Sequence, residues 1–476
     1  MTTKQTRRNF LKTATVCVGT IAGSKIIGAP YILADKETRA KLRTVVIGCG
    51  GQGTGNHTPV AAREQLVALV DPDDKRLAKA MEKAKQTNPK VKMSIKTFND
   101  YRKLFDKMAK EIDVVFIASP NHHHALPALM AMKLGKHVYV EKPLTHTIAE
   151  ARLMADYARQ YKVATQMGNQ GHSGEGYRRL CEYIWSGAIG PVKEVFCWSN
   201  RANGGNGPRP PVLPVPEGMH WDEWIGPSPF RDYHKDLHPH EWHGWHDFGN
   251  GSLGNMGCHI MDGTFWALKL GYPTTVEAEQ MIGGSDERYP IGTRIRWDFP
   301  SRGDMPPVKV FWYDGKRDIA DHVGDEDTIS PASVSKAAAN LPPIVEELEK
   351  KYNRNFGPNG TIYVGEKGYM YTGCYGDGAR IVPEEHHQQV PLPDKLIQRI
   401  KGSHHDNFLV ACRGGEPACS NFDYSSKFVE VTLLGSLAMI AGERKKIEWD
   451  GANMKCTNMP ELSKFILTES RKGWTI

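Results

Sequence analysis

The feature that most constrains this chain is a glycine-rich turn between an apolar segment and a segment that can form a helix. Residues 42–47 have the pattern of a buried parallel strand, and Gly48-Cys49-Gly50-Gly51-Gln52-Gly53 follows directly. In this spacing the first glycine permits a tight turn, the second lets the backbone approach a pyrophosphate, and the third allows close helix packing. The pattern predicts a dinucleotide-binding turn, with a plain tight turn as the alternative. The predicted cofactor contacts are Gly48, Gly50, Gly51, Gln52 and Gly53.

A carboxylate at the end of the next predicted strand bears on the choice of dinucleotide. Residues 65–70 form that strand, and Asp71 follows where a carboxylate would accept hydrogen bonds from an adenosine ribose. A carboxylate there repels a 2′-phosphate, and Pro72-Asp73-Asp74 adds negative charge. We therefore expect NAD as the cofactor. The basic pair Lys75-Arg76 leaves NADP as the less favoured alternative.

Strands alternate with helices through the first third of the chain. This order predicts a doubly wound parallel sheet, and we assign this Rossmann domain to residues 35–165. The further predicted strands are 114–118, 137–140 and 163–166, and the predicted helices are 75–85, 101–107, 124–134 and 148–161.

The rest of the chain, residues 166–476, has a different pattern. Residues 200–257 are rich in Gly, Pro, Trp and His, which predicts long loops over a site. Alternating segments at 293–299, 308–313 and 360–371 predict strands, and residues 425–442 predict a helix on one face of their sheet. The fold class is therefore α/β, with a Rossmann domain followed by an α+β domain. That second domain would carry a large, mainly antiparallel, open sheet for substrate binding and oligomerisation.

The N-terminus has the features of an export signal. Arg7 and Arg8 precede a mildly apolar stretch to residue 32, as in a twin-arginine signal, and we assign residues 1–34 to it. Lys25 and several glycines interrupt this stretch, so a transmembrane anchor is the weaker alternative. We predict export to the periplasm of a protein that folds first and can carry a bound dinucleotide with it. We expect no other membrane contact.

Charge and cysteine placement limit the other partners. The net charge of +7 is spread along the chain, so we expect no nucleic-acid partner. The nine cysteines include no C-x-x-C pair, and the neighbouring histidine pairs lack carboxylates at ligand spacing. We therefore expect buried free thiols and no metal.

Two groups of residues carry chemistry. Lys142 follows the predicted strand 137–140, at the edge of a parallel sheet where ligands bind, and its ammonium could assist proton removal from an alcohol. A surface lysine at a strand end is the alternative. In a helix starting near Met256, His259 and Asp262 would share one face, so that the carboxylate orients the imidazole. A core histidine is the alternative there.

Together these segments resemble the Gfo/Idh/MocA family of glucose-fructose oxidoreductase and inositol dehydrogenase-like enzymes. The resemblance rests on the glycine turn and on the motifs Ser119-Pro120-Asn121 with His124, Trp221 to Pro227, Glu141-Lys142-Pro143, and Gly257-Cys258-His259 with Asp262. It implies that Lys142 is catalytic and that His259 acts as acid and base. It also implies cofactor contacts from Ser119, Pro120, Asn121, His124, Glu141, Lys142 and Gln170.

The chain departs from the family at one catalytic position. Many family dehydrogenases have aspartate four residues before the histidine, whereas this chain has Asn255. An amide can still orient a substrate hydroxyl, but it cannot hold the negative charge that would raise the basicity of His259. We keep Asn255 as a catalytic candidate and regard simple inositol dehydrogenase activity as in doubt.

Flat rings predict a wall for a carbohydrate. Aromatic rings suit the apolar face of a sugar while histidines hydrogen-bond its hydroxyls, and plain packing between domains is the alternative. The predicted substrate contacts are Trp242, His243, Trp245, His246, His172 and Asp262.

These features predict hydride transfer between a tightly bound NAD(H) and a hydroxyl-bearing carbon of a sugar, glycoside or cyclitol. One alternative is NAD-dependent glycoside cleavage by oxidation and elimination, without net redox change. Another is a non-catalytic sugar-binding protein that has kept the fold. The open sheet predicts a homodimer or homotetramer.

Overall fold

The first sheet is parallel and has six strands in the order β3-β2-β1-β4-β5-β6. Its central strands are fully buried apolar runs, as expected where helices cover both faces of a sheet. The predicted strands 65–70 and 137–140 are confirmed. The strands are β1 (Arg43–Ile47), β2 (Gln65–Val70), β3 (Lys96–Phe98), β4 (Val114–Ile117), β5 (His137–Val140) and β6 (Thr165–Met167).

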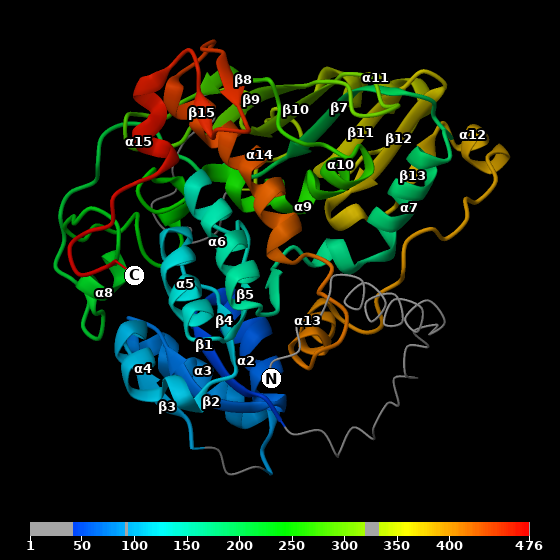
Figure 1. Cartoon of the computed structure of the whole chain (residues 1–476). Helices are drawn as coiled ribbons and strands as arrows, with labels where there is room; N and C mark the ends of the chain where they lie inside the picture. Colours follow the sequence, from blue (N-terminus) through cyan, green and yellow to red (C-terminus); the bar gives the residue numbers. More distant parts are fainter. Residues whose placement is uncertain (1–40, 91–93, 319–332, 476) are drawn as a thin grey trace, which may run out of the picture. The chain divides into compact units, whose positions relative to one another are not determined.

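The computed structural model describes residues 41–90, 94–318 and 333–475. Residues 42–476 form one compact unit (Figure 1). The predicted export signal at 1–34 lies outside the described residues. The predicted boundary between residues 165 and 166 falls inside β6, the last strand of the first sheet.

Three of the five helices of the first sheet begin at side-chain caps. Asp73 accepts a hydrogen bond from the Lys75 amide, and Thr147 and Glu150 form a capping box. The segment after the glycine turn, predicted as helical, is a π-helical turn at Gly53–His57 that continues into α2. The helices are α2 (Thr58–Arg63), α3 (Asp74–Thr87), α4 (Tyr101–Met108), α5 (Ala125–Lys133) and α6 (Ile148–Tyr161).

The second sheet has nine strands in the order β13-β12-β11-β7-β10-β9-β8-β14-β15. Within the described residues, β7 and β10 are its one parallel pair, so the prediction of a mainly antiparallel sheet is confirmed. The strands are β7 (Val192–Ser199), β8 (Thr275–Ile282), β9 (Gly292–Phe299), β10 (Val308–Gly315), β11 (Asn359–Gly365), β12 (Gly368–Gly373), β13 (Arg380–Val382), β14 (Ile447–Asp450) and β15 (Lys455–Cys456).

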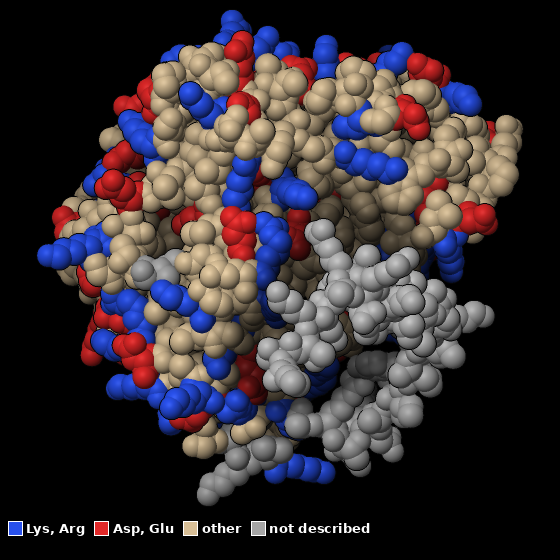
Figure 2. All heavy atoms as spheres, in the orientation of Figure 1, with Lys and Arg blue, Asp and Glu red and all other residues tan. Residues whose placement is uncertain are grey.

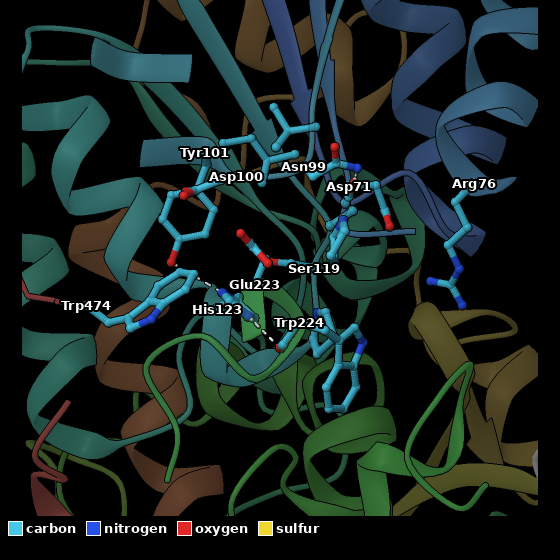
Figure 3. A pocket seen from close by; sticks show the side chains of 16 residues that line it. Asp71, Arg76, Asn99, Asp100, Tyr101, Ser119, His123, Glu223, Trp224 and Trp474 are labelled. Carbon is cyan, nitrogen blue, oxygen red and sulfur yellow. Dashed lines mark hydrogen bonds between the residues drawn. The ribbon is translucent and has the colours of Figure 1, made fainter. Parts of the chain in front are cut away.

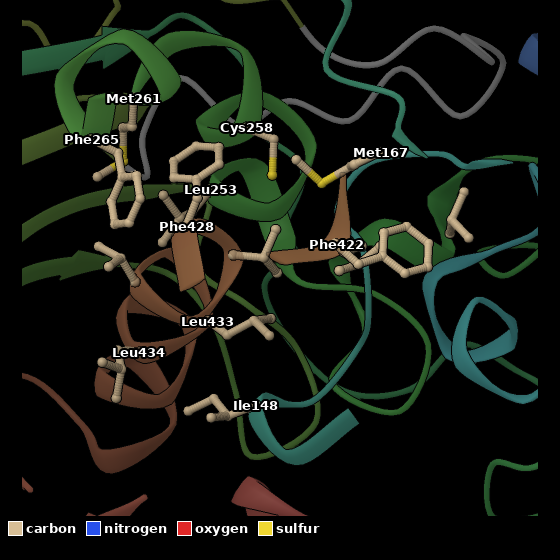
Figure 4. Close-up of a cluster of buried hydrophobic side chains, with 14 of the residues drawn as sticks. Ile148, Met167, Leu253, Cys258, Met261, Phe265, Phe422, Phe428, Leu433 and Leu434 are labelled. Carbon is tan, nitrogen blue, oxygen red and sulfur yellow. The ribbon is translucent and has the colours of Figure 1, made fainter. Parts of the chain in front are cut away.

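Helix α14 (Phe422–Ala441) joins the two sheets into one core. It contacts α6 from the first half of the chain and β8 and β9 of the second sheet. Its side chains Phe428, Leu433 and Leu434 belong to a cluster with residues from both halves (Figure 4). This confirms the predicted helix over one face of the sheet. A Cβ at Gly435 would lie 2.4 Å from the Trp297 ring, so the helix packs closely on β9.

The remaining helices are short, apart from α7, α11 and α13. They are α7 (Glu175–Trp185), α8 (Trp221–Ile225), α9 (Cys258–Ile260), α10 (Asp262–Ala267), α11 (Pro343–Tyr352), α12 (Glu384–Gln389), α13 (His404–Cys412) and α15 (Ser463–Ile466). Within the described part of the chain, none of the helices has the length and apolar character needed to cross a membrane.

Surface charge and thiols follow the sequence pattern. On the face shown in Figure 2, Lys and Arg side chains are interspersed with Asp and Glu. The eight cysteines of the described residues are unpaired, and most of them are buried, as predicted.

Candidate active site

The glycine turn lies between the ends of β1, β2 and β4. Gly48 has φ +85°, and a Cβ there would lie 2.5 Å from the carbonyl carbon of Ala118. A Cβ at Gly53 would lie 1.8 Å from the Gly48 carbonyl oxygen. Only glycine fits these two positions. Gly51 and Gln52 are exposed at the start of the helical segment, where free N–H groups favour an anion.

Asp71 ties the end of β2 to the glycine turn. One carboxylate oxygen accepts a hydrogen bond from the Cys49 amide at 2.6 Å, and the other accepts from the Asp73 amide at 2.8 Å. Burial raises the pKa of Asp71 to about 6, although nearby Arg76 opposes the shift. The carboxylate is buried but lines a pocket, so a ligand can reach it.

That pocket lies beside the ends of β1, β2 and β4 (Figure 3). Asp71 and Arg76 lie on one side, and Tyr101, His123 and Trp474 lie on the other. Arg76 lies against the turn, because a Cβ at Gly50 would meet its guanidinium. The pocket is the place predicted for the adenosine half of a dinucleotide.

The residues of the Ser119-Pro120-Asn121 motif have two different roles. Ser119 and Pro120 line the pocket. Asn121 Nδ2 donates to Asn250 Oδ1 at 2.9 Å. The ring of His124 contacts the carbonyl oxygens of Ser119 and Pro143 at 2.8 and 2.7 Å. His124 therefore holds the end of β4 next to the end of β5, and the protein itself occupies both of its ring nitrogens.

Lys142, at the end of β5, reaches a residue of the second half of the chain. Its Nζ donates to Asn255 Oδ1 at 2.8 Å, and Asn255 Nδ2 donates to Asn203 Oδ1 at 2.9 Å. Burial lowers the pKa of Lys142, while the nearby Glu141 carboxylate opposes this shift. The structure thus brings together Lys142 and Asn255, which are 113 residues apart.

The carboxylate of Glu141, the residue before Lys142, is ionised. Burial alone would raise its pKa, but the hydrogen bond and charge of His57, with Lys142, lower the pKa to about 2. The Glu141 Oε1 to His57 Nε2 distance is 3.0 Å, and His57 Nδ1 lies 3.0 Å from His405 Nε2. Glu141 therefore places a negative charge close to Lys142.

The predicted pairing of His259 with Asp262 is wrong. Asp262 accepts from Asn169 Nδ2 at 2.9 Å and Tyr424 Oη at 2.6 Å and lies 3.0 Å from His172 Nδ1. The segment is not one regular helix: a π-helical turn at Leu253–Gly257 leads into α9, which ends before α10 begins at Asp262. The spacing of three residues therefore does not place the two side chains together.

His172 and Asp262 are also wrong as substrate contacts. Both are buried, and His172 stacks on Trp266 with ring centroids 4.2 Å apart. Their polar atoms satisfy one another inside the second half of the chain. They fix the base of α10 and leave no surface for a sugar.

His259 itself faces the site. Its Nδ1 is buried without a hydrogen-bond partner in the structure, and its ring centroid lies 4.7 Å from that of Tyr375. Burial, and then the charge of Lys142, lower the pKa of His259 to about 3. The imidazole is therefore neutral at pH 7.

The residues of the predicted aromatic wall have different surroundings in the structure. Trp245 is fully buried, with Arg231 and Arg288 guanidinium carbons 5.1 and 4.7 Å from its ring centroid, so its prediction as a substrate contact is wrong. It packs with Trp242 and Phe248 in an aromatic cluster whose members all lie between residues 219 and 248.

The two histidines of that loop each contact a backbone carbonyl. His243 stacks on Trp242 with ring centroids 3.6 Å apart, and its Nδ1 contacts the His240 carbonyl oxygen at 2.8 Å. His246 Nδ1 contacts the Asp286 carbonyl oxygen at 3.1 Å. As substrate contacts, both histidines stay predictions.

Unpartnered buried atoms support a bound ligand. Ser119 Oγ, Gln170 Oε1 and His259 Nδ1 have no hydrogen-bond partner in the structure. Buried polar atoms in folded proteins are normally satisfied, so these three are candidate ligand contacts. Together with the glycine turn and Asp71 they fit a dinucleotide with a substrate beside it.

Tyr375 is a site residue that the sequence prediction missed. It adopts φ +63°, a conformation that is uncommon for a residue with a side chain and that clusters at functional sites. A Cβ at Gly171 would lie 2.8 Å from the Tyr375 Cα, so a glycine makes room for this loop. The pattern Gly373-Cys374-Tyr375-Gly376 was its only sequence signal.

Among the described residues, no group of three or more His, Cys, Asp or Glu side chains could hold a metal ion.

A Rossmann sheet with a glycine turn, joined to an α/β domain that supplies residues to the same site, defines a two-domain NAD-binding oxidoreductase. Two family models match the chain: "Oxidoreductase family, NAD-binding Rossmann fold" over residues 42–169, and "Oxidoreductase family, C-terminal alpha/beta domain" over residues 193–286. The chain belongs to the Gfo/Idh/MocA oxidoreductase family.

Curated relatives match over part of their length. A levoglucosan dehydrogenase of Pseudarthrobacter phenanthrenivorans is 34% identical over 94 residues, which are 20% of this chain and 24% of the relative. A glycosyl hydrolase family 109 protein of Shewanella baltica is 30% identical over 205 residues, which are 39% of this chain and 44% of the relative. The matches thus span between a quarter and a half of these relatives.

A solved structure matches the fold over most of both chains. The WlbA dehydrogenase of Bordetella pertussis, solved with NADH and UDP-GlcNAcA, aligns with a TM-score of 0.53 at 15% identity. The alignment covers 86% of this chain and 99% of that chain. At this identity the match concerns the fold.

Proposed function

We propose that the protein transfers a hydride between a tightly bound NAD(H) and a hydroxyl-bearing carbon of a sugar, glycoside or cyclitol. The observation that carries this proposal is the meeting of Lys142, Asn255 and the unpartnered His259 beside a dinucleotide-binding turn. When bound, the nicotinamide would supply the hydride acceptor or donor. The protein supplies position and proton transfer.

Lys142 and His259 divide the work on the hydroxyl group. The Lys142 ammonium, held by Asn255, can donate a hydrogen bond to the substrate oxygen and stabilise negative charge there. Neutral His259, whose Nδ1 has no hydrogen-bond partner in the structure, can accept the hydroxyl proton. Asn255 carries no charge, so it positions Lys142 without making His259 more basic.

Asp71 supports NAD over NADP. Its carboxylate lines the pocket with one lone pair of each oxygen still available for a ribose hydroxyl. A 2′-phosphate at the same place would meet a buried negative charge. Arg76 lies in the same pocket but forms an ion pair with Asp73, at 3.7 Å, and donates to the Pro239 carbonyl.

The curated relatives support a carbohydrate substrate. One relative is a levoglucosan dehydrogenase, a name that denotes action on a sugar derivative. Tyr375, whose ring lies beside His259, gives this site an aromatic boundary that suits the apolar face of a sugar ring.

A second candidate function is glycoside cleavage without net redox change. The glycosyl hydrolase family 109 relative favours it, because that match spans a longer stretch than the levoglucosan dehydrogenase match. Oxidation next to a glycosidic carbon acidifies the neighbouring C–H bond, and restoring the alcohol afterwards leaves the cofactor unchanged. Release of a free aglycone with no net NADH distinguishes this function from simple dehydrogenation.

Export and assembly complete the proposal. The twin-arginine pattern at the N-terminus supports export with the dinucleotide already bound. We propose a homodimer or homotetramer through the second sheet, which light scattering of the purified protein would measure.

The experiment adds a panel of sugars, glycosides and cyclitols to the purified protein and follows the near-ultraviolet absorbance of reduced nicotinamide. A band that rises with particular sugars and falls with their keto derivatives supports the proposal. If neither the protein as purified nor protein supplied with NAD responds to any sugar, the sugar-binding alternative replaces it.

A further inference from the structure

The C-terminal end of the chain returns to the proposed adenosine pocket. Trp474 is buried and lines the same pocket as Gly48 and Asp71. In Figure 3 its indole lies across the pocket from Asp71 and Arg76. A residue from the last three of the chain thus forms part of a site built mainly from its first 120 residues.

Residues after β3 hold the indole in place. The Arg102 guanidinium carbon lies 3.5 Å from the Trp474 ring centroid, and Arg102 Nη1 donates to the Gly473 carbonyl at 2.8 Å. Arg102 is itself fixed by Asp100 through hydrogen bonds of 2.8 to 3.2 Å. The edge of Tyr101 packs against the indole, with ring centroids 5.8 Å apart. The indole therefore has one defined orientation.

The tail is anchored to the end of helix α8. The Arg471 amide donates to the Pro227 carbonyl at 2.8 Å, and its Nε donates to the Gly226 carbonyl at 3.0 Å. Its Nη1 forms an ion pair with Asp222. We call residues 471–474 the C-terminal latch.

The segment that anchors the latch also closes the pocket from the other side. The His220 amide donates to the Pro72 carbonyl at 2.8 Å, and the Asp74 amide donates to the Gly218 carbonyl at 3.0 Å. Glu223 and Trp224 then line the pocket. The segment thus runs from the loop after Asp71, across the pocket, to the latch.

The backbone at Gly226, where the latch is anchored, is tightly packed. Gly226 has φ +57°, and a Cβ there would lie 2.0 Å from the His123 ring. His123 Nε2 contacts the Trp224 carbonyl at 2.8 Å, and its Nδ1 lies 3.3 Å from the Tyr101 hydroxyl. The latch, residues 218–226 and the first domain therefore contact one another around the pocket.

We propose that the C-terminal latch, through Trp474, binds the adenosine half of the dinucleotide and slows its release. This inference rests on the proposed dinucleotide-dependent function. Adenine has a flat apolar face that aromatic walls favour, and its ribose would meet Asp71 opposite. Because the pocket is closed on both sides, release requires the latch or its anchor to move. The latch is thus the device that keeps a cofactor bound between turnovers.

The test measures the exchange of bound dinucleotide against an excess of isotopically labelled NAD in the full-length protein. Trp474→Ala should speed release roughly ten- to a hundredfold, the range expected for loss of an aromatic contact to a base. Trp474→Phe keeps a flat ring and should release far more slowly than Trp474→Ala. Leu467→Ala changes a side chain of the same C-terminal segment that is 61% exposed and should leave release unchanged.

Arg471→Ala removes the side-chain anchors of the latch and keeps the backbone hydrogen bond to Pro227, and it carries the test if Trp474→Ala fails to fold. It should also speed release. Wild-type release rates in folded Trp474→Ala, or in Arg471→Ala when the first variant does not fold, would overturn the latch. If the wild-type protein neither contains nor binds labelled NAD, the proposed function itself fails, which is a different result.

Discussion

Lys142 and His259 reach one site from two domains, and each depends on its neighbours for its protonation state. Asn255 holds the Lys142 ammonium at 2.8 Å, and burial keeps His259 neutral. A hydrogen-bond donor beside a neutral imidazole is a combination that can remove a proton from an alcohol. The chemistry thus follows from burial and from one amide contact.

Replacing Lys142 should remove most of the turnover. Lys142→Met should lower kcat for sugar oxidation by roughly a hundred- to ten-thousandfold, because a positioned proton-transfer group contributes about that much. Steady-state kinetics with the best sugar of the panel measures the effect. Lys133→Met, an exposed lysine on the preceding helix, is the control and should keep wild-type kcat. A Lys142→Met variant with wild-type kcat would exclude this lysine from the reaction.

Asp71 should make the NAD preference depend on pH. Its raised pKa of about 6 means that the carboxylate is ionised well above pH 6 and neutral well below it. Repulsion of a 2′-phosphate therefore weakens as the pH falls through 6. The ratio of NADP to NAD dissociation constants, measured on cofactor-depleted protein, should drop roughly tenfold between pH 8 and pH 5.

Asp71→Asn is the matched control for this titration. The amide does not titrate, so any remaining pH dependence in this variant belongs to the phosphate. A wild-type ratio that changes no more than the Asp71→Asn ratio would show that Asp71 does not discriminate between the cofactors.

Tyr375 should affect substrate binding more than cofactor binding. Its ring lies beside His259, and its backbone has a left-handed conformation. Tyr375→Ala should raise KM for the sugar about tenfold while the dissociation constant of NAD stays unchanged, because it removes an aromatic contact only. Equal effects on both constants would point to a collapsed loop instead.

At the scale of elements, the turn between β1 and α2 sets the cofactor site. Gly48→Ala should abolish dinucleotide binding, because the new Cβ would lie 2.5 Å from the Ala118 backbone at a φ of +85°. Isothermal titration calorimetry with NAD measures the loss of affinity. Gly55→Ala, where a Cβ meets no atom within 4 Å, should bind as the wild type does. Retained affinity in Gly48→Ala would contradict the assigned turn.

Most elements of the first sheet could be predicted because local pattern determines them, but the short edge strand β3, which is only partly buried, was not predicted. Strands 65–70 and 137–140 and helix 148–161 have the predicted bounds, since buried apolar runs and caps mark them in the sequence. The pairing of His259 with Asp262 could not be predicted, because a π-helical turn and a helix break separate the two residues.

Packing between residues that are distant in the sequence accounts for the other differences between prediction and structure. Trp245 has the composition of a sugar-binding wall, but two arginines and an aromatic cluster bury it completely. Trp474 gave no signal at all, since its place in the pocket depends on contacts with Arg102 and the end of α8. Lys142 and Asn255 were found because each belongs to a short motif, whereas their contact is a product of the fold.

At the scale of the whole molecule, both halves of the chain and its C-terminal residues contribute to the proposed cofactor and substrate sites. The first sheet supplies the glycine turn and Asp71, the second half supplies Asn255 and His259, and the tail supplies Trp474. The proposed export of the folded protein would require a cofactor that stays bound, because a dinucleotide released outside the cytoplasm would be lost. The proposed export and the proposed latch therefore support each other.

The most direct test of the central claim follows a hydride from substrate to cofactor. The full-length protein with its bound dinucleotide is incubated with a responding sugar that carries deuterium on its carbinol carbons. The dinucleotide is then recovered by denaturation and weighed by mass spectrometry. We predict one deuterium in the dinucleotide from the wild-type protein and almost none from Lys142→Met. Recovered dinucleotide without deuterium from the wild-type protein would contradict hydride transfer at this site.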